Sequence, residues 1–394
     1  MKRSNHRTSV KTLCILLIVL HSASMVEAYP PDNAAVLYYR AFLVMKEPSE
    51  EVKEMRSDLR GGKIKSNDQI KQYIEENRRA IELLETAAEM PNCDWGHDES
   101  EGFGLLLPEL GKIRQMAFPL IADAQTLSQN GQHKAALNRC MTIHKMARHV
   151  GDDLLISYLV GIALNNLANG RVEDFLSAMP ADLETLMWLR SQIMGASANV
   201  TSMKTALKRE KEIALREIRK EKIEALLKSM GDAILKDKPT ADAVEKARKG
   251  DDKFFKDNRD YYANVTTDTI AALDLPYLEA HKRLKELNDR IHKDAKENPA
   301  AILTDMLMPA TARICTLGTK RMTLFNALKA AIDIYIIKAK TGRLPDSLPA
   351  GSPKDLFTGM DFEYEKTKDG FVLRSRHKSL DKHETLQCEF KVAK

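Results

Sequence analysis

Apolar residues recur every three or four positions over most of the chain, a spacing typical of amphipathic helices. We predict helices over residues 33–45, 68–89, 105–127, 133–150, 154–167, 201–230, 277–298 and 319–340. The first of these, NAAVLYYRAFLVM, is apolar on almost every side, so we expect it in the core. Pro91 ends the second, and the Gly-, Asn- and Asp-rich residues 92–104 are expected to form a loop.

Two glycine-containing segments indicate that the first half of the chain is built from helical hairpins. Residues 131–137, GQHKAAL, resemble the turn between the two helices of a tetratricopeptide hairpin. Residues 170–175, GRVEDF, look like a degenerate second copy 39 residues later. The pattern predicts antiparallel helical hairpins that are weakly tetratricopeptide-like.

The middle of the chain is rich in charged residues. Within 201–230, Glu212 precedes Arg216 and Glu224 precedes Lys228 at the i,i+4 spacing that stabilises helices. The Glu residues nearly cancel the neighbouring Lys and Arg, so the pattern favours a solvated helix face over an anion-binding one. Residues 236–260 are polar, and we expect a mobile connection or short helices there.

Near the C-terminus the hydrophobic period changes from that of a helix to that of a strand. The helix predicted over 319–340 is followed by Gly342 and Pro345, which are typical of a helix end. Apolar residues then alternate with polar ones at 362–364, 371–373 and 386–392, as in half-buried antiparallel strands.

The dipeptide Asp369-Gly370 is typical of a two-residue hairpin turn. A turn at these two residues would place Glu365 opposite Arg374 and Glu363 opposite Arg376. Both are opposite-charge pairs, which stabilise neighbouring strands. The sequence therefore predicts a hairpin and its register.

These elements together predict a mainly α fold, with antiparallel helical hairpins, a long helix and a small antiparallel β-meander at the C-terminus. We expect four regions along the chain: residues 1–28 as a signal peptide, 29–190 as the helical-hairpin domain, 191–318 as long charged helices, and 319–394 as a helix followed by a three-stranded meander.

The N-terminal residues have the pattern of a secretory leader. Four basic residues precede an apolar run at 13–20, and Val26-Glu27-Ala28 is typical of a cleavage site. An uncleaved anchor is the alternative, but an apolar helix this short spans only about 12 Å of a hydrocarbon core about 30 Å thick. We expect export to the periplasm or cell envelope, and the pattern does not distinguish these from an extracellular location.

Loss of the leader changes the expected partners of the chain. Residues 1–28 carry four Lys or Arg and one Glu, so their removal lowers the formal net charge from +5 to +2. A value this near neutral gives no reason to expect nucleic-acid binding. Since no later segment reaches 18 consecutive apolar residues, we expect no stable membrane span after cleavage.

Four cysteines follow the leader: Cys93, Cys140, Cys315 and Cys388. Export permits disulfides, and four cysteines allow three pairings between which the sequence does not choose. Their wide spacing matches neither a small disulfide scaffold nor a zinc site, so buried thiols are the other interpretation.

The sequence lacks the short motifs of common hydrolases, zinc proteases, nucleotide-binding proteins and dithiol enzymes. We therefore predict no catalytic residue, cofactor or resident metal, and we interpret His144 and His149 as ordinary helix residues. The residues most worth testing are Trp95, His97 and Asp98 in the loop 93–102, together with Arg114 as a surface patch.

The loop 93–102 leaves two interpretations open. It combines a histidine with several carboxylates, which could bind a divalent metal, and Trp95 could line a pocket. Against this, acidic loops are usually solvated and tryptophan usually packs.

Several segments carry a family resemblance: NAAVLYYRAFL at 33–43, CDWG at 93–96, LLLPELGKIRQMA at 105–117, the stretch 136–167, GRLPDSL at 342–348, DLFTG at 355–359 and DGFVLRS at 369–375. Together they resemble a family of large exported bacterial helical proteins. The family has no established activity, so the resemblance implies location and architecture.

The tail alone, residues 319–394, also resembles the periplasmic module of type II secretion pseudopilins. It departs from them because its long helix lies far from the leader. In addition, SRHKS at 375–379 stands where an acidic calcium-binding loop would be, so we expect no calcium.

The leading functional hypothesis is an exported, non-catalytic protein-interaction or structural component of the cell envelope, with a protein partner of unknown identity. The alternative is an unrecognised hydrolase or metal-dependent enzyme centred on the loop 93–102. A third hypothesis, an appendage or secretion component, depends on the shape of the tail.

Overall fold

A computed structural model of the chain describes residues 32–63, 65–151, 154–229, 238–378 and 385–392. The predicted leader at 1–28 lies outside these residues. The described chain is mainly helical and carries a small three-stranded antiparallel sheet after its last long helix. The predicted fold class is therefore confirmed.

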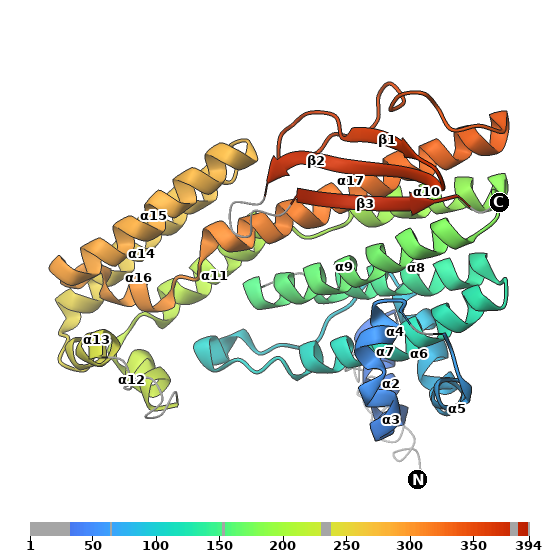
Figure 1. Ribbon diagram of the computed structural model, residues 1–394. Coiled ribbons are helices and arrows are strands. Elements are labelled where there is room, and N and C mark those ends of the chain that lie inside the picture. Colours follow the sequence, from blue (N-terminus) through green and yellow to red (C-terminus); the bar gives the residue numbers. More distant parts are fainter. Residues whose placement is uncertain (1–31, 64, 152–153, 230–237, 379–384, 393–394) are drawn as a thin grey trace, which may run out of the picture.

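The first half of the chain forms a stack of helices (Figure 1). Its elements are α2 (Ala34–Val44), α3 (Glu50–Glu54), α4 (Arg56–Arg60), α5 (Asp68–Glu76), α6 (Arg78–Glu89), the 3-10 helix η1 (Glu99–Gly104), α7 (Pro108–Gln129), α8 (His133–Val150), α9 (Leu155–Ala178) and α10 (Leu183–Ala198). A short turn joins α7 to α8, and α7, α8 and α9 pack against one another as antiparallel neighbours (Figure 1).

Two predictions about this half need correction at single positions. The helix predicted over 68–89 is two helices, because Asn77 separates α5 from α6. The Asn77 side chain accepts a hydrogen bond from the backbone N–H of Lys46 and donates to the Tyr73 carbonyl. In α2, Leu43 is 85% exposed, although the helix buries Ala34, Ala35, Tyr38 and Ala41 in the core.

The second tetratricopeptide-like turn is also wrong. Residues 170–175 lie inside α9, which continues without interruption to Ala178. Val172, Phe175 and Leu176 keep the helical spacing and are buried, so packing outweighs the low helix propensity of Gly170. The turn at Gly131 does form, between α7 and α8.

The second half of the chain forms a lobe and a long helix (Figure 1). Its helices are α11 (Met203–Glu217), α12 (Lys220–Ser229), α13 (Lys238–Arg248), α14 (Asp252–Ala272), α15 (Tyr277–Glu297), η3 (Pro299–Ala301), α16 (Ile302–Leu307) and α17 (Thr311–Thr341). The expected short helices in 236–260 are α13 and the start of α14. The helix ending at Gly342, where φ is 78°, begins eight residues earlier than predicted.

The predicted long helix over 201–230 is interrupted between α11 and α12. At the interruption Ile218 is fully buried, and its carbonyl accepts a hydrogen bond from Arg259 Nη1 at 2.8 Å. A contact with α14 thus replaces the helical continuation.

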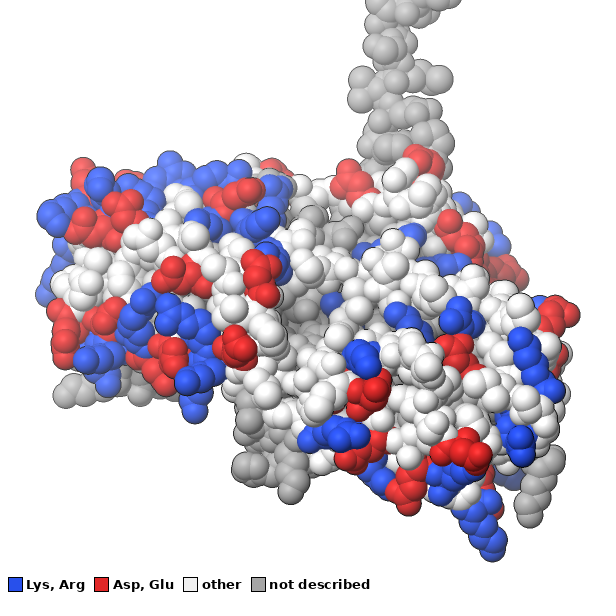
Figure 2. Space-filling model, turned by 90° about the horizontal axis from the view of Figure 1, so that it is seen from above, with Lys and Arg blue, Asp and Glu red and all other residues white. Residues whose placement is uncertain are grey.

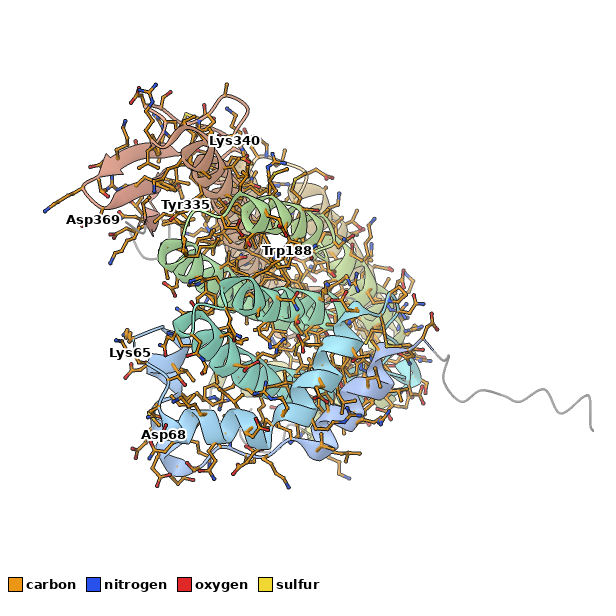
Figure 3. All side chains as sticks on the ribbon, turned by 90° about the vertical axis from the view of Figure 1, so that its right-hand side faces the viewer. Lys65, Asp68, Trp188, Tyr335, Lys340 and Asp369 are labelled. Atoms are coloured by element: carbon orange, nitrogen blue, oxygen red, sulfur yellow. The ribbon has the colours of Figure 1, made fainter. Side chains whose placement is uncertain are left out.

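The sheet has the order β1 (Glu363–Thr367), β2 (Gly370–Lys378) and β3 (Thr385–Lys391). Asp369 marks the tip of the first hairpin and Tyr335 of α17 lies between the sheet and the helices (Figure 3). The buried faces of Phe371 and Phe390 pack against Tyr335. This contact attaches the meander to the helical core.

The hairpin forms as predicted, but its register differs by two positions. Glu363 pairs with Arg374 and Thr367 with Gly370, so the two-residue turn is Lys368-Asp369 and not Asp369-Gly370. The reason is the close approach of β3, since a Cβ on Gly370 would lie 1.9 Å from the Phe390 carbonyl oxygen. Glycine is needed within the strand.

The two charge pairs predicted for the hairpin still form in the observed register, but between diagonal and not directly opposite residues. Arg374 forms an ion pair with Glu365, and Arg376 Nε lies 4.0 Å from Glu363 Oε1. Diagonal neighbours on antiparallel strands remain within reach of long side chains.

The hydrophobic clusters divide the molecule into two lobes. The main core joins the first half of the chain with α17 and the sheet, so the boundary predicted after residue 318 falls inside α17. A smaller cluster around Ile218, Phe255 and Tyr262 holds the lobe of α11 to α16. Another, with Tyr158, Leu207 and Ile314, lies between the two. In Figure 2 the lobe of α14 and α15 carries dense mixed charge, and a hollow separates it from the rest of this face.

One stretch of the described chain, Pro299–Thr341, could cross a membrane by length and composition. The core helix of a globular protein passes the same test. Here α17, which makes up most of the stretch, packs against α9, α10 and α15, and its Phe325, Leu328 and Ile332 are buried in the main core.

Candidate functional site

Trp95, the first of the predicted site residues, is part of the core. Its ring stacks on Tyr38 at a centroid distance of 5.4 Å and contacts the rings of Tyr39 and Phe42. Its Nε1 donates a hydrogen bond to the His149 carbonyl at 2.8 Å. Trp95 is only 9% exposed, so it fixes the loop to α2 and α8.

The other predicted residues do not converge on one point. His97 Nε2 lies 3.1 Å from Oε1 of the buried Glu109, at the start of α7. Asp98 accepts a hydrogen bond from the backbone N–H of Ser100 and so caps η1. Arg114 is exposed on α7. Among the residues that the structure describes, no group of three or more His, Cys, Asp or Glu could hold a metal ion.

The two histidines of α8 are buried and hydrogen-bonded. His144 Nδ1 lies 2.8 Å from Asn165 Oδ1, and His149 Nδ1 lies 2.8 Å from the Tyr38 hydroxyl. Burial lowers the pKa of each to about 4, so both imidazoles are neutral near pH 7.

Burial also raises the pKa of cysteine thiols. Cys140 and Cys388 are buried and Cys315 is partly exposed, and burial raises the thiol pKa of all three, that of Cys140 to about 12. Thiols with raised pKa are poor nucleophiles at neutral pH. In the described part of the chain no disulfide joins the four cysteines.

A pocket of about 520 Å³ lies where the two lobes meet, away from the loop 93–102. We call it the Arg321 pocket. Its walls come from the start of α9, the residues around the start of α11, the turn between α14 and α15, α17, and the loop before the sheet. Apolar side chains form most of the wall, among them Met203, Leu273, Leu275, Pro276, Met322 and Leu356.

Arg321 is the buried charge of this pocket, with 3% of its surface exposed. Its guanidinium lies over the Tyr158 ring, 4.9 Å from the centroid, and Nη2 donates to the Thr201 carbonyl at 2.8 Å. Gly318, one turn earlier, makes room for Tyr158, because a Cβ there would lie 2.2 Å from the tyrosine oxygen.

The arginine lacks a carboxylate neighbour within the described chain. Its Nε is buried without a hydrogen-bond partner there. Burial lowers the pKa of Arg321, and the charge interaction that opposes this comes from the Tyr158 hydroxyl. A guanidinium remains protonated in proteins, so the pocket holds an uncompensated positive charge.

A second cation at the pocket is already paired. Lys204 Nζ lies 2.6 Å from Oδ1 of Asp274, in the turn between α14 and α15. The wall itself contains neither Asp nor Glu among the described residues. The arrangement can therefore hold one negative charge next to an apolar body.

Sequence reasoning missed this pocket, although one signal was present. Arg321 continues the stripe of Phe325, Leu328, Ile332 and Tyr335 at helical spacing, so a single arginine interrupts an otherwise apolar face. A charged residue on a core stripe is a candidate for a special role.

Comparison of the chain with known protein families, with proteins of described function and with solved structures finds no match. The functional conclusion therefore depends on the residues and their geometry.

Proposed function

We propose that the chain is an exported, non-catalytic component of the bacterial cell envelope that acts by binding at the Arg321 pocket. The observation that carries this proposal is a buried arginine without a carboxylate partner, in a mostly apolar pocket between two lobes. Pockets of this size, with apolar walls and few polar groups, are typical of ligand sites. The leader pattern at 1–28 supports export.

The titratable groups support binding over bond making or breaking. The thiols of Cys140 and Cys388 have raised pKa values, and His144 and His149 are buried and neutral, each with its Nδ1 in a hydrogen bond. The rival hypothesis, a hydrolase or metal-dependent enzyme centred on the loop 93–102, has Trp95 lining a pocket, whereas Trp95 packs in the core.

Site-specific photo-crosslinking in living cells tests the proposal. A benzophenone amino acid replaces Leu275, a pocket residue that is 43% exposed. The control replaces Leu278, which is 47% exposed and lies outside the pocket wall. We expect a reproducible adduct, identified by mass spectrometry, at position 275 and not at position 278.

An adduct of equal yield at both positions would indicate unspecific contact with the surroundings. Its absence from both would show that nothing occupies the pocket in the envelope. Either result would overturn the proposed function.

A further inference from the structure

We propose that the Arg321 pocket binds a monoanionic organic carboxylate with an apolar body, such as a medium-chain fatty acid, with its head at Arg321. This inference rests on the proposed function, because it names the ligand class of the same pocket. It follows from three properties of the pocket: the burial of Arg321 without a charged partner, the number of unpaired charges and the apolar wall.

The burial of Arg321 without a charged partner favours an anionic ligand. A buried charge without a partner is strongly destabilising, and a neutral ligand would leave it uncompensated. Arginine presents planar donors that match a carboxylate, and its Nε has no acceptor in the described chain. A carboxylate held against the guanidinium would neutralise the charge, while Nη2 keeps its bond to Thr201.

The number of unpaired charges favours a monoanion. Lys204 is bound to Asp274 at 2.6 Å, so Arg321 alone is left to neutralise a ligand from the described wall. A doubly charged phosphate would keep one charge unpaired in a mostly apolar environment, which is unfavourable. A carboxylate has the matching charge.

The wall favours an apolar body. Met203, Leu273, Pro276 and Met322 line a volume of about 520 Å³. Small-molecule sites typically enclose roughly 300–1,000 Å³. A chain of methylene groups would bury its surface against these side chains, which is favourable in proportion to the apolar area removed from water.

Isothermal titration calorimetry on the full mature chain tests the inference with decanoate as the probe. Decanol, with the same chain and no charge, and decyl phosphate are the comparison ligands. We expect decanoate to bind at one site and at least about tenfold more tightly than decanol, which lacks the charge-assisted hydrogen bond, and than decyl phosphate, which would keep one charge unpaired.

Two kinds of variant connect the binding to the pocket. Arg321→Gln should weaken decanoate binding by about tenfold or more. Leu275→Asp places a negative charge at the wall and should weaken it several-fold, whereas Leu278→Asp, at a similarly exposed position outside the wall, should not. If thermal melting shows that Arg321→Gln is unfolded, the two leucine variants decide the question.

The inference is overturned if decanol or decyl phosphate binds as tightly as decanoate, if Leu275→Asp and Leu278→Asp bind decanoate equally, or if no saturable binding is found. A crosslinked adduct at position 275 together with any of these results would leave the proposed function standing and remove only the ligand class. If the adduct is missing as well, both fail.

Discussion

At the scale of single residues, Glu173 of α9 closes the outer edge of the sheet. Its Oε1 accepts a hydrogen bond from the backbone N–H of Glu389, and Ser177 accepts one from Lys391. An exposed strand edge invites pairing with other chains, and these contacts from α9 occupy it. Burial, together with the nearby Asp174 and Glu389 carboxylates, raises the Glu173 pKa to about 7, although the hydrogen bond and Arg171 oppose the shift.

The raised pKa predicts a pH-dependent stability. The protonated carboxyl is favoured on folding, so its contribution is complete below pH about 4.5 and is lost as the pH rises through about 7. Glu173→Gln retains an oxygen acceptor without the charge. We expect it to unfold like the wild type at pH 4.5 and to be more stable by about 1–2 kcal/mol at pH 8, after allowance for partial solvation. Urea unfolding at both values checks this, and an equal difference at both would contradict it.

The two tryptophans provide a second prediction at this scale. Trp95 is packed between Tyr38, Tyr39 and Phe42, whereas Trp188 on α10 is only partly buried. Trp95→Ala should lower the free energy of unfolding by about 3–5 kcal/mol, the range found for buried aromatic residues. Trp188→Ala serves as the matched control and should cost clearly less. Equal losses in urea unfolding would show that Trp95 is not a core residue.

Residue roles were the least predictable feature of the chain. The composition of the loop 93–102 indicates polar chemistry, but the partners that fix Trp95 and His97 come from α8 and α7. Nothing near them in the sequence identifies these contacts. Conversely, Arg321 could have been selected as a charge on an apolar stripe, but its lack of a carboxylate neighbour depends on the whole fold.

At the scale of elements, periodicity located the three strands and most of the long helices, but it missed α10 and most of α14 and misplaced several ends and interruptions. Buried apolar residues continue through Gly170, so tertiary packing maintains α9 where local glycine suggests a turn. Helices are interrupted at Asn77 and Ile218 because side chains bond to backbone groups there. The Asn77 side chain itself bonds to the backbone of Lys46 and Tyr73, and Arg259 of α14 bonds to the Ile218 carbonyl. The hairpin register differs from the predicted one because Gly370 lies within β2, where it allows β3 to approach closely, and not in the turn.

The two glycines for which the sequence predicts equivalent turns, Gly131 and Gly170, give a direct test at this scale. A Cβ at Gly170 meets no atom within 4 Å, so Gly170→Ala should stabilise the protein by about 0.5–1 kcal/mol, as expected in a helix interior. Gly131 has a φ of +77°, and Gly131→Ala should destabilise it by about 1–2 kcal/mol. Thermal or urea unfolding measures both. Destabilisation by both variants would mean that residue 170 does lie in a turn.

At the scale of the whole molecule, the pocket exists because two lobes with separate hydrophobic clusters meet along α17. Its wall combines residues from 158, 200–204, 273–280, 315–322 and 356, which are widely separated in the sequence. Composition and periodicity predicted the mainly α architecture, but they contain no information on which helices become neighbours across such distances. The site therefore emerges only with the fold.

Native mass spectrometry of the protein purified from the cells that produce it tests the central claim most directly. We expect a chain that begins at Tyr29 and carries a small organic anion, released on denaturation. The adduct should be retained in Leu278→Asp and clearly reduced in Leu275→Asp. A wild-type protein without the adduct, or one whose adduct persists equally in both variants, would contradict the claim that this molecule works by binding an anionic ligand at Arg321.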